Sequence, residues 1–317
     1  MGLLTKTFEG FGIVLRGIAQ VFFLNNPWSG ALLLIAMGLI HPWIAAVVFL
    51  GSALQSLGGW ALNSRQAVRE GTMGYNGALV GAAAAAALGA PGPAVLMTVV
   101  GALACIPVHE IVRTLFASRA LGWAHLPVST APFCIVAGLL FDLLWPLVQP
   151  GTPTSREDLF EGIMLGLFNN FSEVVLSDGI LPGLLIVIAL FVGGMRIGVF
   201  GLVGSLTALA GAFLVHESVI QVSSGMLGYS AVLVSIALGA VVWQGKPLWM
   251  RAGGAIGGVV LTMLLQPVLS LTPVPLYTWP FLLSLWTNML AVAAVERLRR
   301  GNTGVVSARS GPEYQPS

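Results

Sequence analysis

The chain has 317 residues, a formal net charge of +2, 56% hydrophobic residues and only 8% charged residues. Soluble proteins are roughly 45–50% apolar and about 25% charged, so this balance excludes a soluble enzyme domain with a charged shell. It also excludes a disordered chain, which needs few hydrophobic residues, and the small net charge argues against a nucleic-acid partner. We therefore predict an all-α polytopic membrane protein in a lipid bilayer.

Apolar runs follow one another along the whole chain, separated by Gly, Pro or a charged residue. In the first half they cover residues 11–26, 28–40, 42–61, 74–90, 93–116 and 131–149, and in the second half residues 159–177, 181–194, 197–215, 226–243, 252–269 and 279–296. Segments 11–26 and 159–177 are short and interrupted by polar residues, which favours re-entrant helices and leaves ten spans. Residues 301–317 are predicted to form a disordered cytoplasmic tail.

The basic residues agree with ten spans and with both termini in the cytoplasm. When the sides alternate from a cytoplasmic N-terminus, the loops near residues 41, 91, 217 and 273 face outward and contain no Lys or Arg. Arg156, among acidic residues, is the exception on the outer side. The basic residues placed inside are Lys6, Arg65, Arg69, Arg113, Arg119, Arg196, Lys246, Arg251, Arg297, Arg299, Arg300 and Arg309.

The second half repeats motifs of the first half in the same order. Gln20 aligns with Glu173, GYNGALV at residues 74–80 aligns with GYSAVLV at 228–234, and TAPF at 130–133 aligns with TWPF at 278–281. Five spans per half is an odd number, so the second half enters from the opposite side of the membrane. We predict two inverted repeats, 1–150 and 151–300, each with five transmembrane helices and one re-entrant pore helix, and a substrate path between them.

Polar residues at membrane depth are costly and point to function. Gln20 and Glu173 occupy equivalent repeat positions and carry oxygen acceptors, so we expect both near one pathway. The alternatives are that each satisfies a neighbouring backbone group, or that Glu173 pairs with Arg16.

Thr130 and Thr278 each precede a proline by two residues. Because proline lacks a backbone N–H and clashes with the carbonyl four residues back, a helix starts or breaks at each site. Each Thr would then stand near an N-cap with an uncommitted hydroxyl that a substrate could bind, and the alternative is ordinary N-capping of a buried helix.

Other candidates for the pore walls are apolar or aromatic and occur mostly in the repeated motifs. For these side chains, packing against other helices or lipid is the alternative. They are Tyr75, Tyr229, Leu79, Leu233 and Phe23.

The sequence holds no nucleophile–base pair, no zinc-binding spacing and no nucleotide-binding loop. We therefore predict neither an enzyme nor an ATP-driven pump, with no cofactor and no metal. His109 is expected in a charge cluster with Glu110 and Arg113 at a cytoplasmic helix end, and Asp142, which has no repeat partner, in a structural hydrogen bond or a subunit contact.

The repeated motifs resemble those of the urea transporter family. Residues 20–27 (QVFFLNNP), 74–81 and 126–133 are similar to its first-half signatures, and residues 172–176 (SEVVL) and 276–281 (LYTWPF) to those of its second half. The resemblance spans nearly the whole chain. It implies a bacterial member, a homotrimer in the cell inner membrane, in which each protomer conducts urea passively.

The resemblance also implies two urea sites that flank a narrow centre. It makes Gln20 and Glu173 the acceptors of the two sites and places Thr130 and Thr278 at the central constriction. The side chains implied for an apolar slot are Leu79, Leu233, Phe23 and Val174, while Tyr75 and Tyr229 stand where related chains have phenylalanine. The alternatives are a channel for related neutral amides or ammonia, and a proton-coupled secondary transporter that uses Glu173.

Overall fold

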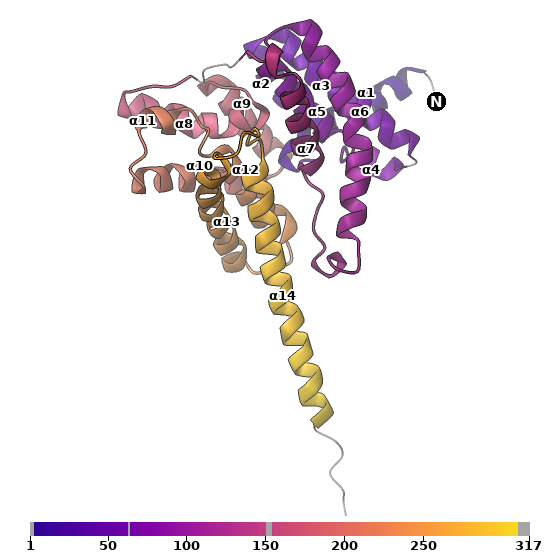
Figure 1. Cartoon of the computed structure of the whole chain (residues 1–317), viewed down its shortest axis with the longest axis vertical. Coiled ribbons are helices and arrows are strands. Elements are labelled where there is room, and N and C mark those ends of the chain that lie inside the picture. The colour runs from indigo at the N-terminus through magenta and orange to yellow at the C-terminus, as the bar shows by residue number, and fades with distance from the viewer. Residues whose placement is uncertain (1–2, 63, 150–153, 310–317) are drawn as a thin grey trace, which may run out of the picture.

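The computed structural model describes residues 3–62, 64–149 and 154–309, with side chains from residue 8 to residue 299 of those ranges. These ranges contain helices and loops but no β-strand, which confirms the all-α prediction (Figure 1). Many large side chains on the outer surface are apolar, including Leu39, Leu57, Leu96, Leu206 and Leu264. An outer surface of this kind suits the hydrocarbon core of a bilayer.

The first half consists of seven α-helices within the described residues. They are α1 (Leu3–Ala19), α2 (Pro27–Ile40), α3 (Pro42–Ala61), α4 (Arg65–Arg69), α5 (Tyr75–Leu88), α6 (Pro91–Phe116) and α7 (Ala131–Leu143). Short 3-10 helices cover Gln20–Phe22, Gly122–Ala124 and Trp145–Leu147.

The second half contains α8 (Leu159–Ser172), α9 (Ile180–Gly193), α10 (Met195–Leu214), α11 (Val219–Ser223), α12 (Tyr229–Ile236), α13 (Leu248–Leu269) and α14 (Trp279–Arg309). A 3-10 helix covers Glu173–Val175, and α12 continues as a π-helix over Ala237–Val242. In the π-helix the carbonyl of Gly239 accepts a hydrogen bond from Nε of Arg251 at 2.7 Å. Arg251, predicted among the cytoplasmic basic residues, is therefore buried against this helix.

Each half begins with a bent pair of helices. The chain turns by 76° between α1 and α2 and by 72° between α8 and α9. In both pairs a 3-10 turn follows the first helix and ends at a residue in the left-handed region, Phe23 (φ 62°) and Leu176 (φ 54°). The two bends fall where the sequence predicts re-entrant helices.

Several predicted spans are shorter in the structure than in the sequence analysis. By length and composition, five helices of the described chain can cross a membrane (α3, α6, α10, α13 and α14), and up to seven if each bent pair is one span. By contrast, α5 and α7 have 14 and 13 residues. A helix of that length reaches about 20 Å, less than the roughly 30 Å of a hydrocarbon core. The ten-span arrangement stays a prediction.

The two halves lie side by side and contact each other through the bent pairs and through α7 and α14. Figure 1 shows the magenta helices of the first half beside the orange helices of the second, with α14 running down from their junction. Side chains at the start of α2 reach backbone carbonyls of α9: Ser29 Oγ donates to Ala189 O at 2.8 Å, and Asn26 Nδ2 donates to Val192 O at 3.2 Å.

The C-terminal helix is longer than the sequence predicts. The disordered tail was expected from residue 301, whereas α14 continues to Arg309. Adding residues to an existing helix needs no new nucleus, which favours this continuation through Gly301 and Gly304. Residues 310–317 lie outside the described residues, and so does the predicted repeat boundary at 150–151.

Candidate functional site

Two helix starts meet in the interior, one from each half of the chain. Helix α7 begins after Thr130 and α14 begins after Thr278, and the hydroxyl oxygens of these threonines lie 2.6 Å apart. Both side chains are buried. Thr130 makes no side-chain capping bond, so ordinary N-capping does not describe it. Its hydroxyl is committed instead to the threonine at the equivalent position of the other half.

The turn before each threonine is held by a tyrosine of the same half. Ser129 (φ 50°) and Tyr277 (φ 36°) both adopt left-handed backbone conformations. The carbonyl of Ser129 accepts a hydrogen bond from the hydroxyl of Tyr75 at 2.6 Å, and the carbonyl of Tyr277 accepts one from the hydroxyl of Tyr229. Each tyrosine therefore fixes the position of a helix start at the centre of the molecule.

Asn76 adds a second support in the first half. Its Nδ2 donates to the carbonyl of Ser129 at 3.3 Å, and its Oδ1 accepts from the backbone N–H of Phe133 at 3.1 Å. This amide satisfies one of the free N–H groups at the start of α7. The equivalent residue in the second half is Ser230, whose buried hydroxyl has no hydrogen-bond partner.

A cavity of about 280 Å³ contains Gln20, and we call it the Gln20 cavity. The amide Nε2 of Gln20 donates to the carbonyl of Glu70 at 2.8 Å, so part of this side chain does satisfy a backbone group. The cavity is lined by Gln20, Val21, Phe23, Thr72, Tyr75, His109, Pro127, Val128, Ser129, Thr130, Val241, Val242 and Leu285.

A second cavity, of about 290 Å³, contains Glu173, and we call it the Glu173 cavity. Among the described residues, Glu173 has no ion pair and its carboxylate has no hydrogen-bond donor. The expected alternative of a Glu173–Arg16 pair is therefore absent from this part of the chain. The cavity is lined by Phe133, Glu173, Val174, Leu176, Met226, Tyr229, Pro275, Leu276, Tyr277 and Thr278.

The two cavities are lined by equivalent positions of the two halves. Nine residues of the Gln20 cavity find their counterparts in the Glu173 cavity at separations of 153, 154 or 148 positions. The pairs are Gln20 and Glu173, Val21 and Val174, Phe23 and Leu176, Thr72 and Met226, Tyr75 and Tyr229, Pro127 and Pro275, Val128 and Leu276, Ser129 and Tyr277, and Thr130 and Thr278. The cavities meet at the hydrogen-bonded threonines, one of which lines each cavity.

The structure does not place every predicted site residue in a cavity. Phe23 lines the Gln20 cavity and Val174 the Glu173 cavity. Leu79 and Leu233 lie one helical turn beyond Tyr75 and Tyr229, are each 1% exposed, and line neither cavity. Their place in an apolar slot stays a prediction.

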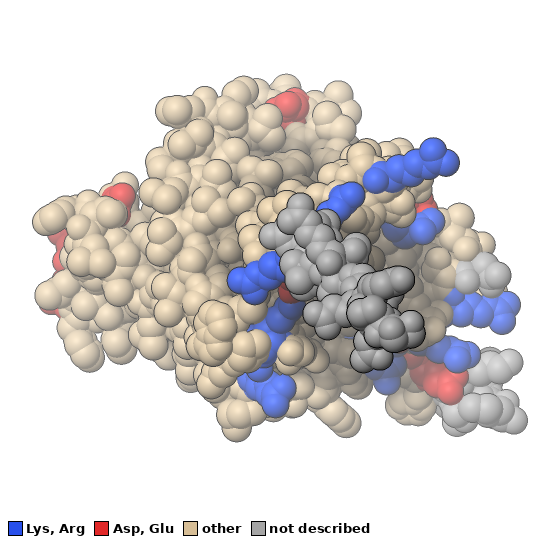
Figure 2. Space-filling model, turned by 90° about the horizontal axis from the view of Figure 1, so that it is seen from below, with Lys and Arg blue, Asp and Glu red and all other residues tan. Residues whose placement is uncertain are grey.

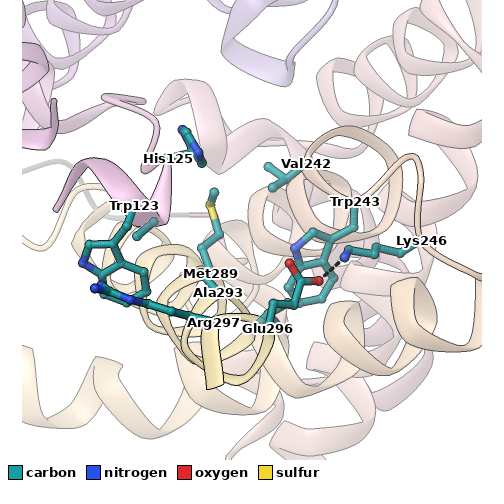
Figure 3. Close-up of a pocket in the computed structure, with 11 residues that line it drawn as sticks. Trp123, His125, Val242, Trp243, Lys246, Met289, Ala293, Glu296 and Arg297 are labelled. Atoms are coloured by element: carbon teal, nitrogen blue, oxygen red, sulfur yellow. Dashed lines mark hydrogen bonds and ion pairs between the residues drawn. The ribbon is translucent and has the colours of Figure 1, made fainter. Parts of the chain in front are cut away.

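A third and larger cavity, of about 580 Å³, shares lining elements with the Gln20 cavity, namely the π-helix after α12 and helix α14. We call it the Trp123 cavity. Val242 lines both cavities, and the wall formed by α14 passes from Leu285 to Met289 and Glu296. In Figure 3 the Lys246–Glu296 ion pair crosses one side of this cavity. On the other side the guanidinium of Arg297 lies over Trp123, with its carbon 5.6 Å from the ring centre.

Basic side chains gather on the face from which α14 projects. Figure 2, which views the molecule from below, shows more Lys and Arg than Asp and Glu side chains on this face. Arg65, Arg113, Arg119 and Arg297 are exposed. The Trp123 cavity, with Lys246 and Arg297 in its wall, belongs to this basic end.

Sequence reasoning did not name most of the other lining residues as candidates, among them His109 and Tyr277. His109 lines the Gln20 cavity, although Glu110 and Arg113 beside it do form the expected ion pair, at 2.6 Å. Tyr277 lines the Glu173 cavity and packs on Phe133 with ring centres 4.9 Å apart. Tyr277 could have been predicted as a lining residue, because it directly precedes Thr278 in the repeated motif. His109 lies in no repeated motif, so the repeat could not indicate it.

The comparisons with known proteins agree with one another. The family model described as urea transporter matches residues 11–293. Urea transporter 1 of Ovis aries is 26% identical over 303 aligned positions, which cover 86% of this chain and 74% of the relative. The same identity and coverage hold for urea transporter 1 of Capra hircus and of Rattus norvegicus.

Proposed function

The chain belongs to the urea transporter family, and on that premise we propose that it is a urea-selective channel through which urea diffuses passively across a membrane. One observation carries the proposal: two cavities with equivalent linings meet at the bonded hydroxyls of Thr130 and Thr278. A path through both cavities offers a solute similar surroundings before and after a narrow centre.

The polar groups of this path suit urea, which is planar and has four N–H donors and one carbonyl acceptor. A pore that removes the water around urea must replace its hydrogen bonds, because an unpaired buried polar group costs about 1–3 kcal/mol. The side-chain oxygens of Gln20 and Glu173 supply acceptors in the two cavities, and the threonine hydroxyls supply acceptors between them. We assign these four residues to urea binding.

The apolar part of each lining accounts for selectivity. Phe23 and Val21 face the Gln20 cavity, and Val174 and Leu176 face the Glu173 cavity. Such walls accept the flat faces of urea but give a hydrated ion nothing to replace its water, so ions are excluded. Tyr75 and Tyr229 bring ring surface to the same walls, while their hydroxyls are committed to backbone carbonyls.

The matched linings support two inverted repeats, with the substrate path at their interface. The left-handed residues recur at the same separations: Phe23 with Leu176, Gly71 with Gly225, and Ser129 with Tyr277. The close helix contact at Gly30, where an added Cβ would lie 1.9 Å from the carbonyl oxygen of Leu15, also recurs at Gly183.

The charge distribution supports an orientation in the membrane. Cytoplasmic loops are enriched in Lys and Arg, and the Trp123 cavity has the basic side chains of Lys246 and Arg297 in its wall. We infer that this cavity is the cytoplasmic vestibule, that Gln20 serves the inner urea site and Glu173 the outer one, and that both termini are cytoplasmic. The family resemblance adds the expectation of a homotrimer in the inner membrane of a bacterium.

Urea flux into proteoliposomes tests the proposal against its alternatives. A urea channel equilibrates urea at a rate that an imposed proton gradient does not change. A channel for ammonia would leave urea outside, and a proton-coupled transporter that uses Glu173 would accumulate urea until a protonophore is added.

A further inference from the structure

One polar side chain of the Gln20 cavity has no positional counterpart in the lining of the Glu173 cavity. His109 lines the Gln20 cavity from α6, and no histidine or other residue of α13, the helix that follows α12 as α6 follows α5, lines the Glu173 cavity. The Gln20 cavity therefore carries a polar group that the repeat does not explain.

His109 has no internal role that uses its nitrogens. No hydrogen bond within the described residues involves its side chain, and its Nδ1 is buried without a partner. Its neighbour Glu110 is committed to Arg113, with carboxylate distances of 2.8 Å to Nε and 2.6 Å to Nη2. Because Nδ1 is closed off from the cavity, a solute there can reach the imidazole nitrogens only at Nε2.

Three other side chains of this cavity each donate one hydrogen bond to a backbone carbonyl. Nε2 of Gln20 donates to Glu70 O, the hydroxyl of Tyr75 donates to Ser129 O, and the hydroxyl of Thr72 donates to Ala67 O at 3.0 Å. The cavity thus has acceptors for the N–H groups of urea, while its carbonyl oxygen still needs a donor. A neutral imidazole always carries one N–H.

We propose that His109 is a specificity-determining residue, whose imidazole N–H donates a hydrogen bond to the carbonyl oxygen of urea in the Gln20 cavity. This inference rests on the proposed function. The binding arrangement places the urea carbonyl toward α6 and its N–H groups toward Gln20 and Ser129. It also gives the Gln20 cavity a hydrogen-bond donor that has no equivalent in the lining of the Glu173 cavity.

The test compares urea with thiourea, whose sulfur is a much weaker acceptor. We expect His109→Leu to lower urea flux into proteoliposomes about threefold to tenfold, as the loss of one hydrogen bond implies, and to lower thiourea flux much less. His109→Gln keeps an N–H donor and should restore part of the urea flux. His216→Asn is the matched control, because His216 is exposed, lines no described cavity and has a left-handed backbone that Asn tolerates.

Proportional loss of urea and thiourea flux in His109→Leu would overturn the inference, because damage to packing slows both solutes alike. Unchanged urea flux in His109→Leu would overturn it as well. A parent protein that conducts no urea would instead contradict the proposed function, and this result is distinguishable because it appears before any variant is made.

Discussion

Thr130 and Thr278 are 148 positions apart in the chain, yet their hydroxyl oxygens lie within 2.6 Å of each other at the starts of α7 and α14. In such a pair one hydroxyl donates and the other accepts, so one O–H and several lone pairs stay available to a passing solute. The sulfur of Cys134 lies 3.1 Å from the Thr278 hydroxyl and makes the centre slightly more polar. This contact joins the two halves at the point where the two cavities meet.

The variants Thr130→Val and Thr278→Val remove one hydroxyl each while nearly conserving side-chain size. Each should reduce urea flux about tenfold, because urea then passes the centre with one polar contact fewer, worth about 1.4 kcal/mol. Stopped-flow light scattering of proteoliposomes measures the flux. Flux equal to that of the parent in both variants would remove these threonines from the pathway.

Each single valine variant also leaves the other threonine without its partner. The double variant should therefore lose less stability than the sum of the two single variants, as residues in direct contact are not additive. Thermal unfolding of the four proteins in detergent gives this comparison. Strict additivity would mean that the 2.6 Å contact between the hydroxyls contributes nothing.

Replacement of Glu173 by Gln should slow urea several-fold, and replacement by Leu should slow it at least tenfold. A hydrogen bond to a carboxylate is about twice as strong as one to a neutral group, but an amide oxygen still accepts, which is the role proposed for Gln20 at the equivalent position. Glu157→Gln is the matched control, because Glu157 is exposed and lines no described cavity. If Glu173→Leu conducts like the parent, the outer site is elsewhere.

Asn76 and Ser230 occupy equivalent positions but differ in hydrogen bonding, so replacement by alanine should change the stability of the protein by different amounts. Asn76→Ala leaves the carbonyl of Ser129 and the N–H of Phe133 with fewer partners and should destabilise the protein by about 1–3 kcal/mol. Ser230→Ala removes a buried hydroxyl that has no partner and should change stability by less than about 0.5 kcal/mol. Equal shifts of the unfolding midpoint in the two variants would contradict a structural role for the Asn76 hydrogen bonds.

Helices α3 and α5 pack closely through glycines, so a larger residue at such a glycine should destabilise the protein. An added Cβ at Gly77 would lie 2.2 Å from the carbonyl oxygen of Gly51, so Gly77→Ala should destabilise the protein by about 1–3 kcal/mol. At Gly257 in α13 nothing lies within 4 Å, and alanine there should be neutral or stabilising. Detergent-solubilised variants of equal thermal stability would show that the helices can separate without cost.

The repeat made much of the candidate site predictable. Gln20, Glu173, Thr130 and Thr278 stood out because polar residues at membrane depth recurred in repeated motifs that keep the same order in both halves, and the structure places each of them in a cavity lining. His109 has no such counterpart in the Glu173 cavity, and its charged neighbours Glu110 and Arg113 favoured a surface interpretation. A residue that breaks the symmetry of a repeat carries no repeat signal.

Helix lengths were less predictable than helix positions. The apolar runs at 74–90 and 131–149 begin within one residue of α5 and α7 but extend beyond the ends of both helices, so hydropathy alone does not show where each helix ends. The starts are held by tertiary hydrogen bonds, such as Tyr75 to Ser129 and Phe133 to Asn76, between residues more than 50 positions apart. The sequence could indicate the prolines and the repeated order of motifs, but not which backbone carbonyl each tyrosine would reach.

Urea flux of the purified protein in proteoliposomes, measured with and without an imposed proton gradient, distinguishes a passive urea channel from its alternatives. A passive channel equilibrates urea rapidly and equally in both conditions, and Thr130→Val and Glu173→Leu slow that flux. Absence of urea flux, or accumulation of urea against its gradient that a protonophore abolishes, would contradict the proposed passive channel.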